Sequence, residues 1–357
     1  MEIAARRCGL VIALVGMLFA CDPRHRGYLQ DDSGDGAYSY ISIGFYNVEN
    51  LFDTIDDPEV FDEEFTPAGE KRYDSDVYEQ KIAHLTRVIA DMAKRGRGPL
   101  ALLGVAEVEN REVLRDLIRG LSDKKLRYRF IHRNSPDQRG VDVALLYYPG
   151  LFQPLDVRMH RVDLSRDGEE VRPTRDIMEV KGVLDRDTIF VMVNHWSSRR
   201  GGREASEWKR IRAARVVRRV VDSIFGLHPT ARIVIMGDFN DEPVNESITE
   251  VLRAKGDTTD EDATVLFNPA HAHYHRGLGS LAYRDAWSLF DQIILSRAWL
   301  KDETGWRFVE FKIFRPAYLT TPYGQYKGYP LRTYAGNTYL GGYSDHFPVY
   351  IVVRRPK

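Results

Sequence analysis

The sequence predicts an α/β domain in which two packed β-sheets are flanked by helices. Strand-like runs dominate the chain, because many segments alternate apolar with polar residues or are rich in Val, Ile and Tyr. The few helix-like segments lie between them, so a strictly alternating parallel sheet is not expected. With 357 residues, 43% of them hydrophobic, the chain suits one large domain or two small ones. We find no repeat and no internal linker, which favours one large domain.

The predicted elements follow from local pattern. The strand-like runs, in order, are 41–47, 101–106, 127–132, 141–147, 177–184, 188–194, 232–237, 291–296, 307–314 and 348–354. The helical segments are about 77–95, 110–120, 205–225 and 245–254. The first of these carries Ile82, Leu85, Val88, Ile89 and Met92 at helical spacing. Segments 257–290 and 316–344 have weak periodicity and are expected to be long surface loops, which are often functional.

The N-terminus is expected to lie outside the fold. A basic pair precedes an apolar stretch that is too short to span a membrane stably, which predicts a signal peptide over 1–20. The stretch ends in LFAC, which resembles the lipobox of bacterial lipoproteins, and cleavage there would leave a lipidated Cys21. We therefore expect 21–40 to be a lipidated polar tether. The protein would be exported and membrane-anchored, facing the periplasm or the cell exterior. A plain cleaved signal peptide is the alternative.

Polar residues collect at the ends of six predicted strands. The motif GDFN at 237–240 follows the apolar run 232–236, and SDH at 344–346 precedes the apolar run 349–353. The other clusters contain Asn47, Glu107, Asn194-His195 and Asp291. One such residue is usually a cap or a solvated loop residue, but six clusters in one chain are harder to explain that way. Carboxylates with Asn and His can hold a hard cation and activate water beside a phosphate.

This ordered set resembles the endonuclease/exonuclease/phosphatase superfamily, which includes deoxyribonucleases, inositol polyphosphate phosphatases and sphingomyelinases. The motifs GDFN and SDH are the most specific, and FYNVEN at 45–50 and VNH at 193–195 support them. The resemblance covers about 41–354 and implies a catalytic domain over 41–357. It also implies a four-layer α/β sandwich, with two mixed β-sheets packed face to face and helices on the outside.

The resemblance implies which residues would hold the metal. Glu107 would be the principal ligand of Mg²⁺, with Mn²⁺ or Ca²⁺ as alternatives, while Asn47 and Asp345 would complete the metal end. Glu49 and Glu109 lie two residues beyond matched positions, and we expect them to be rim residues.

The resemblance also implies the catalytic residues. Asp238 would orient or deprotonate the attacking water, and Asn240 would contact the phosphate. His346, oriented by Asp291, would act as base or transition-state ligand. His195 would contact the phosphate and assist the leaving group.

Substrate contacts are predicted for three arginines. The formal net charge is −1, so any nucleic-acid binding requires a local basic patch. Arg199 and Arg200 adjoin His195 in the most basic segment of the chain and are expected to meet phosphate. The arginines of the helix that follows are expected to be solvated. Arg175 resembles the family's phosphate-contacting arginine, and a surface salt bridge is the alternative.

Two further groups have ordinary explanations. His271, His273 and His275 could suggest zinc, but the mature chain would lack cysteine and the segment lacks further acidic ligands, which favours a mobile loop. The tyrosines of 316–344 could stack bases or simply pack the loop.

The predicted activity is a Mg²⁺-dependent phosphodiester hydrolase, an exported nuclease acting on DNA or RNA. The alternative enzyme is a phosphatase or phosphodiesterase acting on inositol phosphates or phospholipids such as sphingomyelin. The polar segment 316–344 is a poor match for a membrane-entering hairpin. A binding module without catalysis is disfavoured, because no matched catalytic position is substituted. No obligate protein partner is inferred.

Overall fold

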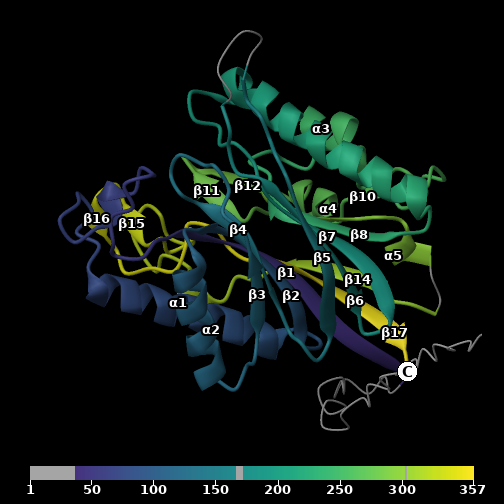
Figure 1. Cartoon of the computed structure of the whole chain (residues 1–357), viewed down its shortest axis with the longest axis horizontal. Coiled ribbons are helices and arrows are strands. Elements are labelled where there is room, and N and C mark those ends of the chain that lie inside the picture. Colours follow the sequence, from purple (N-terminus) through teal and green to yellow (C-terminus); the bar gives the residue numbers. More distant parts are fainter. Residues whose placement is uncertain (1–36, 166–171, 302–303) are drawn as a thin grey trace, which may run out of the picture.

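A computed structural model describes residues 37–165, 172–301 and 304–357 (Figure 1). The predicted signal peptide, Cys21 and the tether up to residue 36 lie outside this range. Strand β1 begins at Tyr38, inside the segment predicted as tether. None of the described helices combines the length and the apolar character needed to cross a membrane.

A six-stranded mixed sheet forms one half of the centre, in the order β14-β17-β1-β2-β4-β3. Its strands are β14 (Arg307–Ile313), β17 (Val349–Pro356), β1 (Tyr38–Leu51), β2 (Leu100–Val108), β4 (Asp142–Tyr147) and β3 (Arg129–His132). β1 pairs parallel with β2 and antiparallel with β17. The first and last strands of the described chain are therefore neighbours.

A seven-stranded mixed sheet forms the other half, in the order β5-β6-β7-β8-β13-β10-β9. Its strands are β5 (Phe152–His160), β6 (Ile177–Leu184), β7 (Asp187–His195), β8 (Arg232–Asp238), β13 (Asp291–Leu295), β10 (Leu266–Phe267) and β9 (Ala254–Lys255). β7 and β8 pair parallel, and β13 runs antiparallel to β8. Both sheets are mixed, as predicted.

The two sheets pack face to face through one apolar core. Ile43 and Leu102 from the first sheet join Val191 and Met236 from the second in this cluster, and all four are fully buried. The sheets approach closely at Gly104, where an added Cβ would lie 2.6 Å from the Met236 sulfur. A larger residue there would require the Met236 side chain to move.

Helices cover both outer faces. α1 (Ser75–Arg95) and α2 (Arg111–Asp123) pack on the first sheet and α3 (Arg203–Leu227) on the second, on opposite sides of the molecule (Figure 1). α1 begins where Asp74 caps the Val77 N–H, and α2 begins where Asn110 caps two N–H groups. The order helix, sheet, sheet, helix confirms the predicted four-layer sandwich.

Several local predictions were wrong. β5 was missed because it is an edge strand with mostly exposed or half-buried residues, and Pro154 interrupts its sequence. The helix predicted at 245–254 is only a short π-helical turn, Ser247–Val251. Segment 257–290 is not a plain loop: it contains β10, α4 (Ala270–Tyr274), β11 (Leu281–Tyr283) and β12 (Ala286–Ser288).

Segment 316–344 is also more ordered than expected. It holds a hairpin of β15 (Tyr334–Ala335) and β16 (Thr338–Tyr339), and α5 (Ala298–Lys301) lies further upstream. Tyr334 and Tyr343 are buried, so part of the tyrosine set packs the fold, whereas Tyr323 and Tyr326 are exposed. The predicted histidine loop is the short helix α4, in which the His271 and His275 rings lie 4.5 Å apart.

Candidate active site

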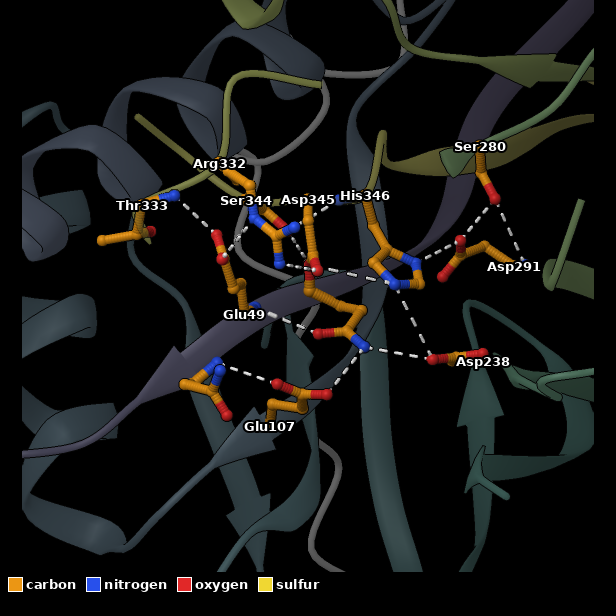
Figure 2. Close-up of polar contacts among 12 residues, drawn as sticks. Glu49, Glu107, Asp238, Ser280, Asp291, Arg332, Thr333, Ser344, Asp345 and His346 are labelled. Carbon is orange, nitrogen blue, oxygen red and sulfur yellow. Dashed lines mark hydrogen bonds and ion pairs between the residues drawn. The ribbon is translucent and has the colours of Figure 1, made fainter. Parts of the chain in front are cut away.

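The predicted catalytic and metal residues meet at one end of the two sheets. Figure 2 shows five of them: Glu107, Asp238, Asp291, Asp345 and His346. The full set comes from the ends of β1, β2, β7 and β8, the start of β13 and the segment before β17. His195 pairs with Asp238 across β7 and β8, and Asp291 pairs with Asp238 across β13 and β8. Because paired strands lie only about 5 Å apart, strand register alone brings these three residues together.

Asn47 links the two sheets at the bottom of the site. Its amide nitrogen donates to Glu107 Oε1 at 3.3 Å and to Asp238 Oδ2 at 3.1 Å. The strand register shifts after Asn47 and again at Glu107, whose backbone is left-handed with φ of 63°. Bulges re-aim side chains, and strained non-glycine backbone tends to cluster at functional sites. The sheet is therefore irregular where Glu107 faces the site.

His346 is held by carboxylates. Its Nδ1 lies 2.7 Å from Asp291 Oδ2, which also accepts a hydrogen bond from Ser280. Its Nε2 lies 4.0 Å from Asp238 Oδ2 and 3.9 Å from Asp345 Oδ1. Burial opposes protonation, but the carboxylates of Asp291 and Asp238 outweigh it and raise the pKa of His346 well above its usual value. These neighbours therefore favour the protonated form of His346.

His195 has the opposite charge preference. Its Nε2 lies 3.7 Å from both Glu107 Oε1 and Asp238 Oδ2. Burial lowers the pKa of His195 well below its usual value, and the nearby cations Arg175 and Arg139 lower it further. The surroundings therefore favour the neutral form of His195 and the protonated form of His346 around the same carboxylate.

Asp238 lies between the two histidines and is fully enclosed. Burial raises the pKa of Asp238 to about 7, although His346 opposes this rise. Asn240, with a left-handed φ of 51°, donates its backbone N–H to Asp238 Oδ1 at 2.9 Å. The Asn240 amide nitrogen donates to the Trp196 carbonyl at 3.0 Å. The GDFN turn thus holds its own carboxylate in place.

The segment 331–345, which we call the strap, closes the metal side of the site. Arg332 Nη2 donates to Asp345 Oδ2 at 2.9 Å, and Arg332 Nε lies 3.5 Å from Glu49 Oε1. Glu49 Oε2 accepts the Thr333 N–H at 2.7 Å. Glu49 is buried, so the expectation of a rim residue was wrong: it fastens the strap that carries Asp345.

Lys81 of α1 donates hydrogen bonds to the strap, and this role was not predicted. Its fully buried ammonium donates to Thr333 Oγ1 at 2.6 Å and to the Tyr343 carbonyl at 2.8 Å. Burial lowers the pKa of Lys81 to about 8, while the negative charge of Glu49 opposes the fall. A signal existed, because Lys81 lies four residues before Leu85 on the apolar stripe of its helix.

Arg175 donates hydrogen bonds to backbone carbonyls at the end of β7. It is buried, and its nitrogens donate to Asp137 Oδ2 at 2.9 Å, to the His195 carbonyl at 3.2 Å and to the Trp196 carbonyl at 2.9 Å. The salt-bridge alternative describes this position, although the partner is buried rather than on the surface. A phosphate contact by Arg175 stays a prediction.

Arg199 and Arg200 occupy different environments. Arg199 donates to the Asn240 carbonyl at 2.9 Å and to Asp241 Oδ1 at 3.1 Å, so it supports the GDFN turn. Its guanidinium also lies 4.4 Å from the Phe290 ring centroid. Arg200 is exposed on the loop before α3. A direct substrate contact therefore suits the position of Arg200 better.

Arg139 is a second residue that sequence reasoning missed. It lies in the loop 133–141 between β3 and β4, is exposed, and donates from Nη2 to Asn50 Oδ1 at 2.5 Å. Asn50 in turn donates its backbone N–H to Glu107 Oε2 at 3.0 Å. An arginine among the turn residues SPDQRG, just before a predicted strand, was the available signal.

The donor set fits a hard divalent cation. Among the described residues no group of three or more His, Cys, Asp or Glu side chains forms a ready metal cluster. Mg²⁺ does not require one, since it binds through one or two carboxylates and keeps several waters. Glu107 and Asp345 both keep partly exposed carboxylates at the site, with side-chain exposures of 15% and 33%. Oxygen ligands with room for water suit Mg²⁺ or Mn²⁺.

A family model described as "Endonuclease/Exonuclease/phosphatase family" matches residues 42–355, which include every residue of this site. The chain belongs to the endonuclease/exonuclease/phosphatase family. It is therefore a phosphoesterase of this superfamily, whose enzymes typically depend on a divalent metal. No curated protein sequence matches the chain significantly.

Solved structures of the family share the fold at low sequence identity. Truncated TDP2 from Caenorhabditis elegans is 13% identical, with 88% of this chain and 97% of that chain covered and a TM-score of 0.54. A mannosyl-6-phosphatase from Bacteroides thetaiotaomicron is 14% identical, with 88% and 99% covered and a TM-score of 0.54. TDP2 from D. rerio, solved with a single-strand DNA product, is 12% identical, with 88% and 99% covered and a TM-score of 0.53.

Proposed function

We propose that the chain is a divalent-metal-dependent phosphodiesterase that acts as a nuclease on DNA or RNA outside the cytoplasm. One observation carries this proposal. Two imidazoles of opposite charge preference, His195 and His346, face the same buried carboxylate, Asp238, at Nε2 to Oδ2 distances of 3.7 Å and 4.0 Å. A proton acceptor between a neutral and a cationic ring suits water attack on a phosphate.

Each of these side chains has a distinct task. The pKa of about 7 lets Asp238 take a proton from the attacking water near neutral pH. The His346 imidazolium, fixed by Asp291 at 2.7 Å, places a donor where negative charge develops on the phosphate. The neutral His195 adds a second hydrogen-bonding group on the other side of Asp238.

The metal end lies beside this group. Glu107, with Asn47 and Asp345 next to it, would hold Mg²⁺, or alternatively Mn²⁺ or Ca²⁺, which would supply positive charge to the phosphate oxygens. Asn47 Nδ2 spans Glu107 and Asp238 and so fixes the relative position of the metal end and the proton acceptor.

The choice of nucleic acid rests on the cations at the site. Fold relatives include both a protein solved with a single-strand DNA product and a mannosyl-6-phosphatase, so the fold does not choose the substrate. Arg139 and Arg200 are exposed. Arg139 donates to Asn50, whose backbone N–H donates to Glu107, and Arg200 lies in the loop that follows His195. Exposed arginines near a phosphodiester site favour a polyanionic substrate. Sugar phosphates, inositol phosphates and phospholipids remain the alternative class.

Export and lipid attachment at Cys21 are part of this proposal. They are supported by the apolar stretch 9–20 and the LFAC sequence that follows it. A nuclease at the cell surface would meet nucleic acid from outside the cell.

The test is nicking of supercoiled plasmid by purified protein with Mg²⁺ or with EDTA. Mg²⁺-dependent nicking, reduced about 10²–10⁴-fold in His346→Ala, is the expected result. An intact plasmid would exclude a general DNA endonuclease, and RNA, then inositol phosphates and phospholipids, would be assayed next.

A further inference from the structure

A cavity of about 240 Å³ opens beside the metal end of the site. It is bounded by the end of β1, by the loop that carries Lys71 and Tyr73, and by the strap. Two of its lining residues contact predicted metal ligands: Asn50 N–H donates to Glu107 at 3.0 Å, and Arg332 donates to Asp345 at 2.9 Å. A substrate whose phosphate lies at this end of the site would extend its neighbouring group into the cavity.

The cavity wall offers groups for a polar, anionic ligand. The Lys71 ammonium lies between the Phe65 and Tyr334 rings, at 5.2 Å and 5.3 Å from their centroids. It also lies 3.2 Å from the Gly336 carbonyl and 3.2 Å from Glu64 Oε2, so its charge is partly balanced.

Tyr73 also lines the cavity, but its hydroxyl is buried and is not open to a ligand. Asn50 and Arg332 add polar groups to the wall, and the Glu49 carboxylate in the same wall lies 3.5 Å from Arg332.

Arg139 stands at the Asn50 wall of this cavity. No carboxylate in the described ranges pairs with its guanidinium, which donates to Asn50 Oδ1. The loop that carries it is braced: Asp137 accepts the Arg139 backbone N–H at 3.1 Å and also binds Arg175 at 2.9 Å. The Gln138 carbonyl accepts the Phe61 N–H at 2.7 Å. These contacts hold the loop backbone in place, and the Arg139 guanidinium that it carries has no carboxylate partner among the described residues.

We propose that Arg139 and this cavity form a subsite for the phosphate next to the scissile one, with the intervening sugar in the cavity. The inference rests on the proposed function, since it takes the scissile phosphate to lie at the Glu107 end. A guanidinium binds phosphate through two parallel hydrogen bonds. The cavity is smaller than the ~300–1,000 Å³ usual for small-molecule sites, which suits a single nucleotide unit. The preferred substrate is therefore a strand with phosphates on both sides of a sugar.

Binding of thymidine nucleotides, measured by titration calorimetry in Mg²⁺, tests the subsite without requiring turnover. The purified protein should bind thymidine 3′,5′-bisphosphate about tenfold tighter than either thymidine monophosphate. Arg139→Ala should remove most of this difference and leave monophosphate binding within about twofold. Arg139→Lys should keep part of the bisphosphate preference, because lysine retains the positive charge but cannot make the two parallel hydrogen bonds of a guanidinium. Arg133→Ala, which removes another exposed arginine of the same loop, should keep the full difference.

Equal affinity for the three nucleotides, no binding of any of them, or an equal loss of all three in Arg139→Ala would overturn the subsite. These outcomes are separate from those of the plasmid assay. A preference for the bisphosphate without plasmid nicking supports the subsite and removes the endonuclease. Plasmid nicking without a preference for the bisphosphate supports the endonuclease and removes the subsite.

Discussion

At the scale of single residues, the site depends on how neighbours set the charge of two histidines. Burial and nearby cations lower the pKa of His195, whereas nearby carboxylates raise the pKa of the equally buried His346. Asp291 is decisive for the second case, because it lies 2.7 Å from His346 Nδ1 and is itself fully buried. The charge of His346 should therefore respond to Asp291 more than to any solvent-exposed group.

Replacing Asp291 with Asn should keep the shape of the site and change its pH dependence. The Asp291 carboxylate raises the pKa of His346, so its removal lets His346 lose its proton at lower pH. We expect kcat/KM on a phosphodiester to fall about 100-fold or more, and the alkaline limb of its pH profile to move to lower pH. The measurement is kcat/KM against pH for both proteins.

Ser280→Ala is the matched control for this experiment. It removes the hydroxyl that donates to Asp291 but leaves the carboxylate and its charge in place. The alkaline limb should then stay near its wild-type position. If Asp291→Asn left the pH profile unmoved, His346 would not be the group that titrates in that limb.

At the scale of elements, much of the site could be predicted because strand ends are local features. GDFN follows an apolar run and SDH precedes one, so the sequence places Asp238 and His346 at strand ends. The pairing of β7, β8 and β13 then brings His195, Asp238 and Asp291 side by side. This part of the site can therefore be predicted from sequence motifs and from strand register.

Other parts depend on contacts between segments far apart in the chain. Lys81 meets the strap about 250 positions later, and no local pattern shows which segment will lie over α1. Arg139 matters only because its loop meets the end of β1 at Asn50. β5 was missed for a different reason: its sequence alternates apolar and polar residues, but Pro154 near its start argues against a strand unless the strand lies at a sheet edge, as β5 does.

Lys81→Met should loosen the strap and destabilise the fold. The change removes two hydrogen bonds to the strap, to Thr333 and Tyr343, and the cation that balances the buried Glu49. Breaking a buried charge pair on one side typically costs about 3–5 kcal/mol. We expect a loss of that order in the free energy of unfolding, measured by urea denaturation, together with reduced activity because the strap carries Asp345.

Two further variants show whether the loss arises from the buried charge. Lys94→Met removes an exposed lysine from the same helix and should change stability by less than about 1 kcal/mol. Adding Glu49→Gln to Lys81→Met removes the carboxylate left without its partner and should recover part of the loss. Equal destabilisation by the Lys81 and Lys94 changes would mean that helix propensity, not the buried ammonium, is responsible.

At the scale of the whole molecule, the two ends of the described part of the chain lie opposite the site. The Lys357 N–H donates to the Ala37 carbonyl, so both ends of the described chain meet at the start of β1. β1 reaches the site nine residues later, at Asn47, which is roughly 30 Å away at ~3.3 Å per residue. Figure 1 shows the C-terminus beside β1 and β17, at the outer edge of the molecule. A lipid on Cys21 would hold the enzyme by the end opposite its site, leaving the site open to large substrates.

Cys21→Ser should therefore release the protein from membranes without affecting its chemistry. In bacterial cells that express the whole chain, the wild type should take up an alkyne fatty acid and sediment with membranes until detergent is added, because acyl chains anchor through buried CH₂ groups. Cys21→Ser should lose both properties and keep the same plasmid-nicking activity. Cys8→Ser changes the other of the two cysteines, inside the predicted signal peptide, and should behave as wild type. A wild-type protein found unlabelled and free of membranes would instead indicate a plain cleaved signal peptide.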